Sequence, residues 1–144
     1  MIRIPQKLVA EITGAAEGVH PEECCGLLVG RGGEAGDILV TRLAPSPNVA
    51  DGDRRKSFLV DAKIQFDLMR ELGDGPDKIV GNYHSHPGAP ARPSDHDRQS
   101  VYYPDHVWVI VAVEDGRAGE VAAYVFDRDD DNFREIGLAE PDDT

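Results

Sequence analysis

The chain has 144 residues, the usual size of one folded domain, and carries a formal net charge of -12. That charge repels phosphate backbones and anionic lipids, so we expect neither nucleic-acid nor membrane binding. No apolar run approaches the roughly 20 residues of a membrane span, and the adjacent Cys24 and Cys25 cannot supply spaced crosslinks. We expect a soluble protein of the reducing cytoplasm, with one domain over residues 1–144 and an acidic, flexible tail from about residue 138.

The first half of the chain predicts a helix, a hairpin and a long loop. Residues 5–18 have apolar side chains at helical spacing after a proline suited to a first helical turn. Residues 25–31 and 37–44 are apolar runs with strand composition on either side of a glycine pair, which predicts an antiparallel hairpin. Residues 45–57 combine prolines, a glycine and charges without periodicity, which predicts a surface loop facing a substrate.

A second helix and a strand follow. Two glycines end the predicted amphipathic helix, whose apolar residues are Val60, Ile64, Phe66, Leu68, Met69 and Leu72. Residues 78–86 predict the next strand, and residues 94–102 a third, short helix.

The last third of the chain predicts strands. Residues 107–113 predict a buried strand, residues 120–127 its hairpin partner, and residues 132–136 an edge strand. Strands interleaved with helices over this length predict an α/β fold, in which a mixed, mostly antiparallel sheet is sandwiched by helices.

His84 and His86 are two residues apart at the end of the strand predicted over residues 78–86. Because strand side chains alternate between faces, both imidazoles project the same way and can reach one metal ion. Zinc takes about four ligands, of which a catalytic site normally draws three from the protein. Two hydrogen-bonded or surface histidines are the commoner explanation of an isolated pair, so the metal interpretation requires a third ligand.

The third ligand is sought downstream, in a segment rich in proline and glycine that can turn the chain back. Asp97, on the first turn of the predicted helix, is the natural carboxylate ligand. Asp95 and His96 are rivals, because helical neighbours point about 100° apart and spacing alone chooses weakly among the three. Ser94 and Asp97 also fit a capping box, in which each side chain covers a backbone N–H of the other residue.

Two motifs connect these residues to a known family. The segment HSHPGAPARPSDHD fits H-x-H-P, six residues, then S-x-x-D, and PEECCGLLVG supplies an E-x-C-G arrangement upstream. Through both motifs the chain resembles the JAMM, or MPN-plus, metalloisopeptidase family. The resemblance implies an MPN/JAMM-like architecture, which is similar to that of cytidine deaminases, and one zinc ion per chain held by His84, His86 and Asp97.

The resemblance also implies two catalytic residues. Glu23 in the E-x-C-G register would be the general base, with Glu22 the adjacent alternative. Ser94 would face the carbonyl oxygen of the scissile bond as it becomes an oxyanion, a role that competes with helix capping.

Other polar residues give weaker candidates. Cys24 and Cys25 could supply a thiolate nucleophile, although packing as small buried residues is the more common role of cysteine. His20 and His106 match no ligand spacing relative to the main motif, so the expectation is one metal ion.

The family cleaves amide and isopeptide bonds after the C-terminal tail of ubiquitin-like proteins, and its small members resemble peptidases that trim sulfur-carrier proteins. The resemblance therefore implies a ubiquitin-like or sulfur-carrier protein with a Gly-Gly tail as the substrate, held in part by the loop at residues 45–57. The alternative is a noncatalytic MPN-type scaffold that binds proteins. A zinc deaminase is disfavoured because the H-x-E and P-C-x-x-C pattern is absent.

Overall fold

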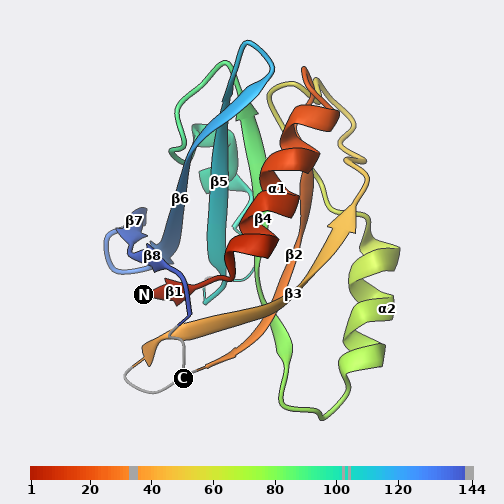
Figure 1. Ribbon diagram of the computed structural model, residues 1–144, viewed down its shortest axis with the longest axis vertical. Helices are drawn as coiled ribbons and strands as arrows, with labels where there is room; N and C mark the ends of the chain where they lie inside the picture. The colour runs from red at the N-terminus through yellow and green to blue at the C-terminus, as the bar shows by residue number, and fades with distance from the viewer. Residues whose placement is uncertain (33–35, 102, 104, 142–144) are drawn as a thin grey trace.

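The computed structural model describes residues 1–32, 36–101, 103 and 105–141. Within these residues, eight strands form one sheet in the order β7-β6-β5-β4-β2-β3-β1-β8 (Figure 1). The strands are β1 Ile2–Arg3, β2 Cys25–Gly32, β3 Ile38–Ser46, β4 Lys78–Pro87, β5 Val107–Glu114, β6 Arg117–Asp127, β7 Asn132–Ile136 and β8 Leu138–Ala139. The helices are α1 Gln6–Gly18, α2 Ala62–Leu72 and α3 Asp95–Gln99. A mixed sheet with helices on its faces confirms the predicted α/β fold.

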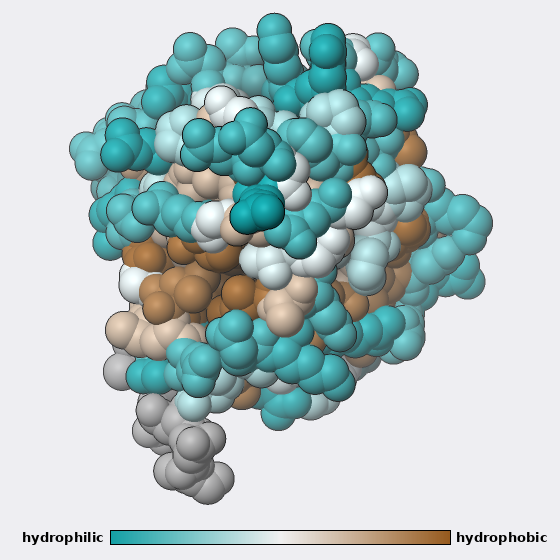
Figure 2. All heavy atoms as spheres, turned by 45° about the horizontal axis from the view of Figure 1, so that its top comes forward, coloured by the Kyte–Doolittle hydropathy of each residue, from teal (hydrophilic) through white to brown (hydrophobic). Residues whose placement is uncertain are grey.

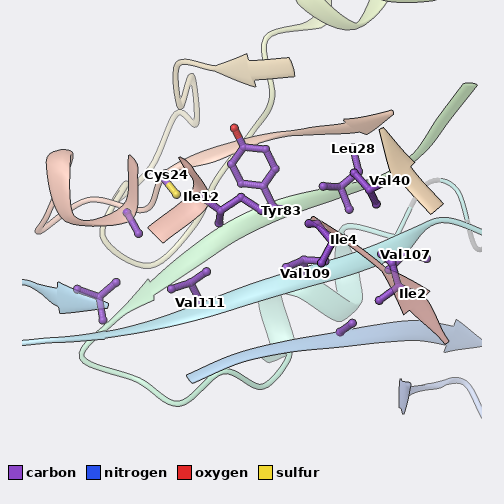
Figure 3. Close-up of a cluster of buried hydrophobic side chains, with 13 residues drawn as sticks. Ile2, Ile4, Ile12, Cys24, Leu28, Val40, Tyr83, Val107, Val109 and Val111 are labelled. Carbon is purple, nitrogen blue, oxygen red and sulfur yellow. The ribbon is translucent and has the colours of Figure 1, made fainter. Parts of the chain in front are cut away.

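Strand alternation divides the core between the two faces of the sheet. Along β5, Val109 and Val111 join the cluster beneath α1, whereas Trp108 and Ile110 belong to a separate cluster. Figure 3 shows the cluster beneath α1, in which labelled side chains from α1 and the strands converge. Its members include Ile2, Ile4, Ile12, Cys24, Leu28, Val40, Tyr83 and Val107.

The opposite face is covered by α2 and by the segment around α3. Leu68 of α2 packs with Leu27, Val29 and Ala44 of the neighbouring strands. The cluster of Trp108 and Ile110 also lies on this face, because even-numbered positions of β5 point away from α1.

Strand β4 lies inside the sheet, between β2 and β5. It is antiparallel to β2, with Cys25 opposite His84, and parallel to β5. A parallel pair requires a crossover connection, and here the crossover contains α3. The crossover therefore returns the downstream part of the H-x-H-P motif to the end of β4.

Two segments differ from the sequence-based expectations. Phe66 and Met69 are exposed, because Leu68 and Leu72, four residues apart, form the face of α2 that packs against the sheet. Leu138, in β8, pairs with Ile2 of β1. The expectation of a flexible tail from about residue 138 is therefore wrong for the first residues of that segment. A two-residue strand has no readable periodicity of its own.

The short third helix ends at Gln99, and Tyr102, at the end of its predicted range, lies outside the described residues.

Figure 2 shows hydrophilic side chains over most of one face of the molecule, with apolar atoms gathered in a band below its centre. Among the described residues, no helix is long and apolar enough to cross a membrane.

Candidate metal centre

Strand β4 presents two histidines on the face of the sheet that carries α2 and α3. His84 and His86 are two residues apart in the strand, so both side chains project from the same face. Both are buried, and their Nε2 atoms lie 3.1 Å apart. The predicted convergence of the two imidazoles is present in the structure.

Helix α3 supplies a carboxylate to the same point. The Oδ2 atom of Asp97 lies 3.2 Å from Nε2 of His84 and 3.1 Å from Nε2 of His86. Asp97 is buried, whereas Asp95 and His96 are exposed to solvent. Of the three rivals in the sequence, the structure therefore brings only Asp97 to the histidines.

The capping box at the start of α3 is also present, so the two interpretations of Ser94 and Asp97 are compatible. The backbone N–H of Asp97 donates to Oγ of Ser94 at 3.1 Å, and the backbone N–H of Ser94 donates to Oδ2 of Asp97 at 2.9 Å. The box fixes the rotation of α3 and so aims the Asp97 carboxylate at the histidines. The hydroxyl of Ser94 still has its own proton to donate.

Glu23 comes from the residues just before β2. Cys25 pairs with His84 across the strands, and extending this antiparallel register by two residues places Glu23 opposite His86. Glu23 is 4% exposed, and side-chain ligand atoms of Glu23, His84 and His86 lie within 4.8 Å of one another. Its neighbour Glu22 is only partly buried and is not part of this group.

Burial sets the protonation of the Glu23 carboxyl. Desolvation raises the pKa of Glu23 to about 8, although the nearby charge of His86 opposes the increase. Its Oε1 atom is buried and has no hydrogen-bond partner among the described residues. A carboxyl with a pKa near neutrality and a free oxygen is suited to accepting and returning a proton.

The three clustered groups perturb one another. Burial alone would raise the pKa of Asp97, but the charge of His84 and hydrogen bonds from both histidines hold it well below its usual range. Burial lowers the pKa of His84, which favours its neutral form. Burial also acts to lower the pKa of His86, but the hydrogen bond and charge of Asp97, together with the Pro90 carbonyl and the charge of Glu23, outweigh that effect and the pKa is raised.

The outer ring nitrogens of the two histidines are held differently. Nδ1 of His86 lies 3.0 Å from the carbonyl oxygen of Pro90, an arrangement that orients a metal-binding imidazole. Nδ1 of His84 is buried without a hydrogen-bond partner among the described residues. Instead, Phe58 stacks on the His84 ring with centroids 4.1 Å apart, and Trp108 packs edge-on at 5.6 Å. Ring packing therefore fixes the orientation of His84.

The donor set fits a divalent metal ion. In a tetrahedral zinc site with ligand bonds of about 2.0–2.1 Å, ligand atoms lie about 3.3 Å apart. The three separations of 3.1 to 3.2 Å among His84 Nε2, His86 Nε2 and Asp97 Oδ2 are close to this value. The cluster therefore has the composition and spacing to hold one metal ion.

Other candidates lie apart from this cluster or are unsuited to chemistry. His106 stacks on Tyr103, and neither His20 nor His106 belongs to the group of possible metal ligands among the described residues. Both cysteines are buried, and desolvation raises the pKa of Cys24 and raises that of Cys25 to about 12. These thiols are therefore protonated near neutral pH, which favours packing over nucleophilic catalysis.

A cavity of about 400 Å³ adjoins the cluster on the face of α2 and α3. Its walls combine apolar and aromatic side chains, such as Leu27, Phe58, Val60 and Trp108, with polar ones such as Asn82. Phe58 and Trp108 are the same rings that contact His84, so these two rings separate the cavity from the candidate metal ligands, which are not among its walls.

Sequence reasoning missed the surroundings of the cluster. Asn48 belongs to the long loop at residues 45–57 and Phe58 directly follows it, in a stretch between β3 and α2 where no periodicity marks a residue as structural. The sequence indicates Trp108, its single tryptophan, only as part of a buried strand. The adjacency of β4 and β5 places Trp108 beside this site, and it cannot be read from either strand alone.

Comparisons with known proteins agree with this architecture. Residues 5–127 match the family Prok-JAB, described as prokaryotic homologs of the JAB domain. The chain is 31% identical over 124 residues to the desampylase of Haloferax volcanii, covering 86% of this chain and 82% of that protein. It is 30% identical over 118 residues to the CysO-cysteine peptidase of Mycobacterium tuberculosis, covering 81% of this chain and 77% of that protein.

The fold is shared with a JAB1/MPN domain protein from Archaeoglobus fulgidus, whose crystal structure superimposes with a TM-score of 0.57 at 21% identity. That likeness covers 99% of this chain and 98% of the other and shows the fold alone. It confirms the MPN-type architecture that the two motifs predict. Since the family match extends from α1 through β6 and includes the whole cluster, the chain belongs to the prokaryotic branch of the JAB, or JAMM, family.

Proposed function

We propose that this chain is a zinc-dependent peptidase that hydrolyses the amide bond after the Gly-Gly-type C-terminal tail of a ubiquitin-like or sulfur-carrier protein. The observation that carries the proposal is the convergence of His84, His86 and Asp97 beside the buried carboxyl of Glu23. Relatives named desampylase and CysO-cysteine peptidase support the reaction and the class of substrate.

In this proposal, His84, His86 and Asp97 hold one zinc ion per chain. Bound zinc supplies Lewis-acid chemistry, in which water and the scissile carbonyl are polarised. Water adds to the carbonyl carbon, the C–N bond breaks, and the amine leaves with a proton. The Gly-Gly tail is released as a carboxylate.

Glu23 handles the proton in this reaction. Oε1 of Glu23 accepts a proton from the attacking water and then delivers it to the leaving nitrogen. Burial raises the pKa of this carboxyl to about 8, and the positive charge of a bound zinc ion would lower it, which favours the carboxylate that accepts the proton. The hydroxyl of Ser94 donates to the carbonyl oxygen as negative charge develops there. Its oxygen continues to accept the backbone N–H of Asp97.

The cavity beside the cluster provides a place for the tail. Its walls, formed by the 50–60 segment on one side and by residues after α3 on the other, leave a space of about 400 Å³. An extended chain ending in two glycines has no side chains to clash with Phe58 and Trp108 near His84. The loop at residues 45–57 would thus contribute to substrate binding, as its composition suggests.

The single-domain organisation and the location are part of the proposal. All described strands belong to one sheet, which supports one domain over residues 1–144. The adjacent thiols of Cys24 and Cys25 remain free, which supports action in the cytoplasm.

Metal content and turnover measured on the same preparations test the proposal. Protein purified without chelator is compared with His84→Ala, Asp97→Asn and Glu23→Gln by elemental analysis. Each preparation is then assayed on a Gly-Gly-terminated ubiquitin-like protein fused through its last glycine to a reporter amine. Wild type should contain about one zinc per chain, and His84→Ala and Asp97→Asn should contain little.

Glu23→Gln distinguishes loss of the general base from loss of the zinc ion. It should keep its zinc and lose about 10² to 10⁴-fold in turnover, the usual contribution of a general base. A wild-type protein that remains metal-free after zinc is supplied, or binds zinc without cleaving any Gly-Gly fusion, would overturn the peptidase proposal. In that case a protein-binding scaffold becomes the better account of the chain.

A further inference from the structure

The side chain of Asn48, in the loop between β3 and α2, makes four hydrogen bonds. Its Nδ2 donates to the carbonyl oxygens of Glu23 at 3.1 Å and Ser57 at 3.0 Å. Its Oδ1 accepts the backbone N–H groups of Ala50 and Leu59, each at 3.1 Å. An amide has two donor hydrogens and two acceptor lone pairs, so its hydrogen-bonding capacity is fully used.

These bonds connect two parts of the candidate site that are distant in sequence. Ser57 and Leu59 flank Phe58, whose ring stacks on His84. The other end of the network is the backbone of Glu23. Asn48 therefore links the residue that positions the His84 ring to the residue placed as general base.

The loop holds Glu23 from a second direction as well. The backbone N–H of Glu23 donates to the carbonyl oxygen of Arg54 at 2.8 Å. The Arg54 side chain in turn donates to the carbonyl oxygen of Ala50 at 3.1 Å. The backbone N–H of Ala50 is itself bound by Asn48. Both backbone polar groups of Glu23 are thus bound by a loop whose shape depends on Asn48.

We propose that Asn48 is a positioning residue, which holds the Glu23 carboxyl and the Phe58 ring in register with His84. Its amide groups are occupied by backbone partners, so it acts through Glu23 and Phe58 and does not contact the substrate. The inference rests on the proposed peptidase function for its kinetic consequence. Its structural consequence, the placement of Phe58, is independent of any activity.

Two substitutions of Asn48 remove different parts of its hydrogen-bond network. Asn48→Asp keeps an oxygen for the N–H groups of Ala50 and Leu59, but loses both donors to Glu23 and Ser57. Asn48→Ala loses all four bonds, and thermal unfolding shows whether each variant is folded. The control is Arg55→Ala in the same loop, because Arg55 is exposed and, among the residues that the structure describes, its side chain pairs only with Asp53.

Trp108 reports on Phe58 without an activity assay. It is the only tryptophan of the sequence, it is 3% exposed, and its ring lies 5.9 Å from that of Phe58. In zinc-loaded protein, both Asn48 variants should shift the emission maximum to longer wavelength and increase quenching by acrylamide, because Phe58 no longer covers the indole. Arg55→Ala should match wild type.

Kinetics then test the link to Glu23. On the Gly-Gly fusion, Asn48→Asp should lower kcat by about 10 to 100-fold, the usual cost of losing an outer partner of a metal site, with KM little changed. At saturating zinc in a Glu23→Gln background, the same substitution should lower the residual rate by much less, because the group through which it affects proton transfer is already removed and only the effect through Phe58 remains.

Wild-type emission and quenching in both Asn48 variants would overturn the inference, as would an equal fall in rate with and without Glu23. Failure of the proposed function is recognised separately, since wild type would then lack turnover on every Gly-Gly fusion. The tryptophan measurement decides the positioning role of Asn48 in that case, because a shift supports it and an unchanged spectrum rejects it.

Discussion

Gly26 and Tyr83 are paired across β2 and β4, and the Tyr83 ring lies where a side chain at residue 26 would be. Tyr83 is fully buried in the cluster beneath α1 (Figure 3). The glycine of the E-x-C-G motif therefore has a packing role, because it lets the ring lie across β2. The contact helps to fix the register that places Glu23 opposite His86.

Gly26→Ala is expected to destabilise the protein. The added methyl group would overlap the buried Tyr83 ring, and overpacking of this kind costs about 1–3 kcal/mol. Urea denaturation followed by circular dichroism measures the change in the free energy of unfolding. Gly14→Ala is the matched control: Gly14 lies in α1 with open space around it, and the substitution should stabilise the protein by about 0.5–1 kcal/mol. Equal effects of the two substitutions would contradict the packing role of Gly26.

Ser94 has two roles that substitutions can separate. As an N-cap it accepts the N–H of Asp97, and replacing an N-cap serine costs about 1 kcal/mol with alanine but only a few tenths with glycine. Ser94→Gly should therefore be more stable than Ser94→Ala. If the hydroxyl also donates to the oxyanion, both variants should lose about 10² to 10³-fold in kcat. A glycine variant that recovers activity together with stability would leave Ser94 with the capping role alone.

Phe58 is expected to control metal affinity. Phe58→Ala removes the ring that stacks on His84 at 4.1 Å, and the imidazole has no hydrogen bond at Nδ1 from a described residue to hold it in place. Affinity for zinc, measured by competition with a chromogenic chelator, should fall by about 10 to 100-fold. The control Phe66→Ala makes the same change on the outer face of α2, where the side chain is 65% exposed, and should bind zinc as wild type does. Identical affinities in the two variants would show that the ring does not orient His84.

Periodic elements could be predicted from the sequence, and elements that depend on distant partners could not. Alternating or helically spaced apolar residues predicted α1, α2 and the two hairpins close to their observed bounds. The two-residue strands β1 and β8 depend on each other, since Ile2 pairs with Leu138 from the far end of the chain. Nothing local to either segment indicates that pairing.

The same distinction applies to the candidate site. His84 and His86 could be paired from strand alternation, because the period of two is local information. Asp97 could not be separated from Asp95 and His96, because the rotation of α3 is set by its capping box and by the crossover that carries it. Glu23 could be selected over Glu22 only through the family motif, since its approach depends on the pairing of β2 with β4.

The buried thiol of Cys25 predicts a loss of stability at alkaline pH. Desolvation raises the pKa of Cys25 from 9.0 to about 12 in the folded protein, so the unfolded chain releases this proton first as the pH rises. The free energy of unfolding contributed by this group should be constant below about pH 9 and fall between about pH 9 and pH 12. Release of one proton changes this free energy by at most about 1.4 kcal/mol per pH unit.

Wild type and Cys25→Ala should be compared by urea denaturation from pH 7 to pH 11. The unfolding free energy of wild type should fall relative to that of Cys25→Ala as the pH rises above 9. A difference that stays constant over this range would show that the thiol ionises as readily in the folded protein as in the unfolded chain.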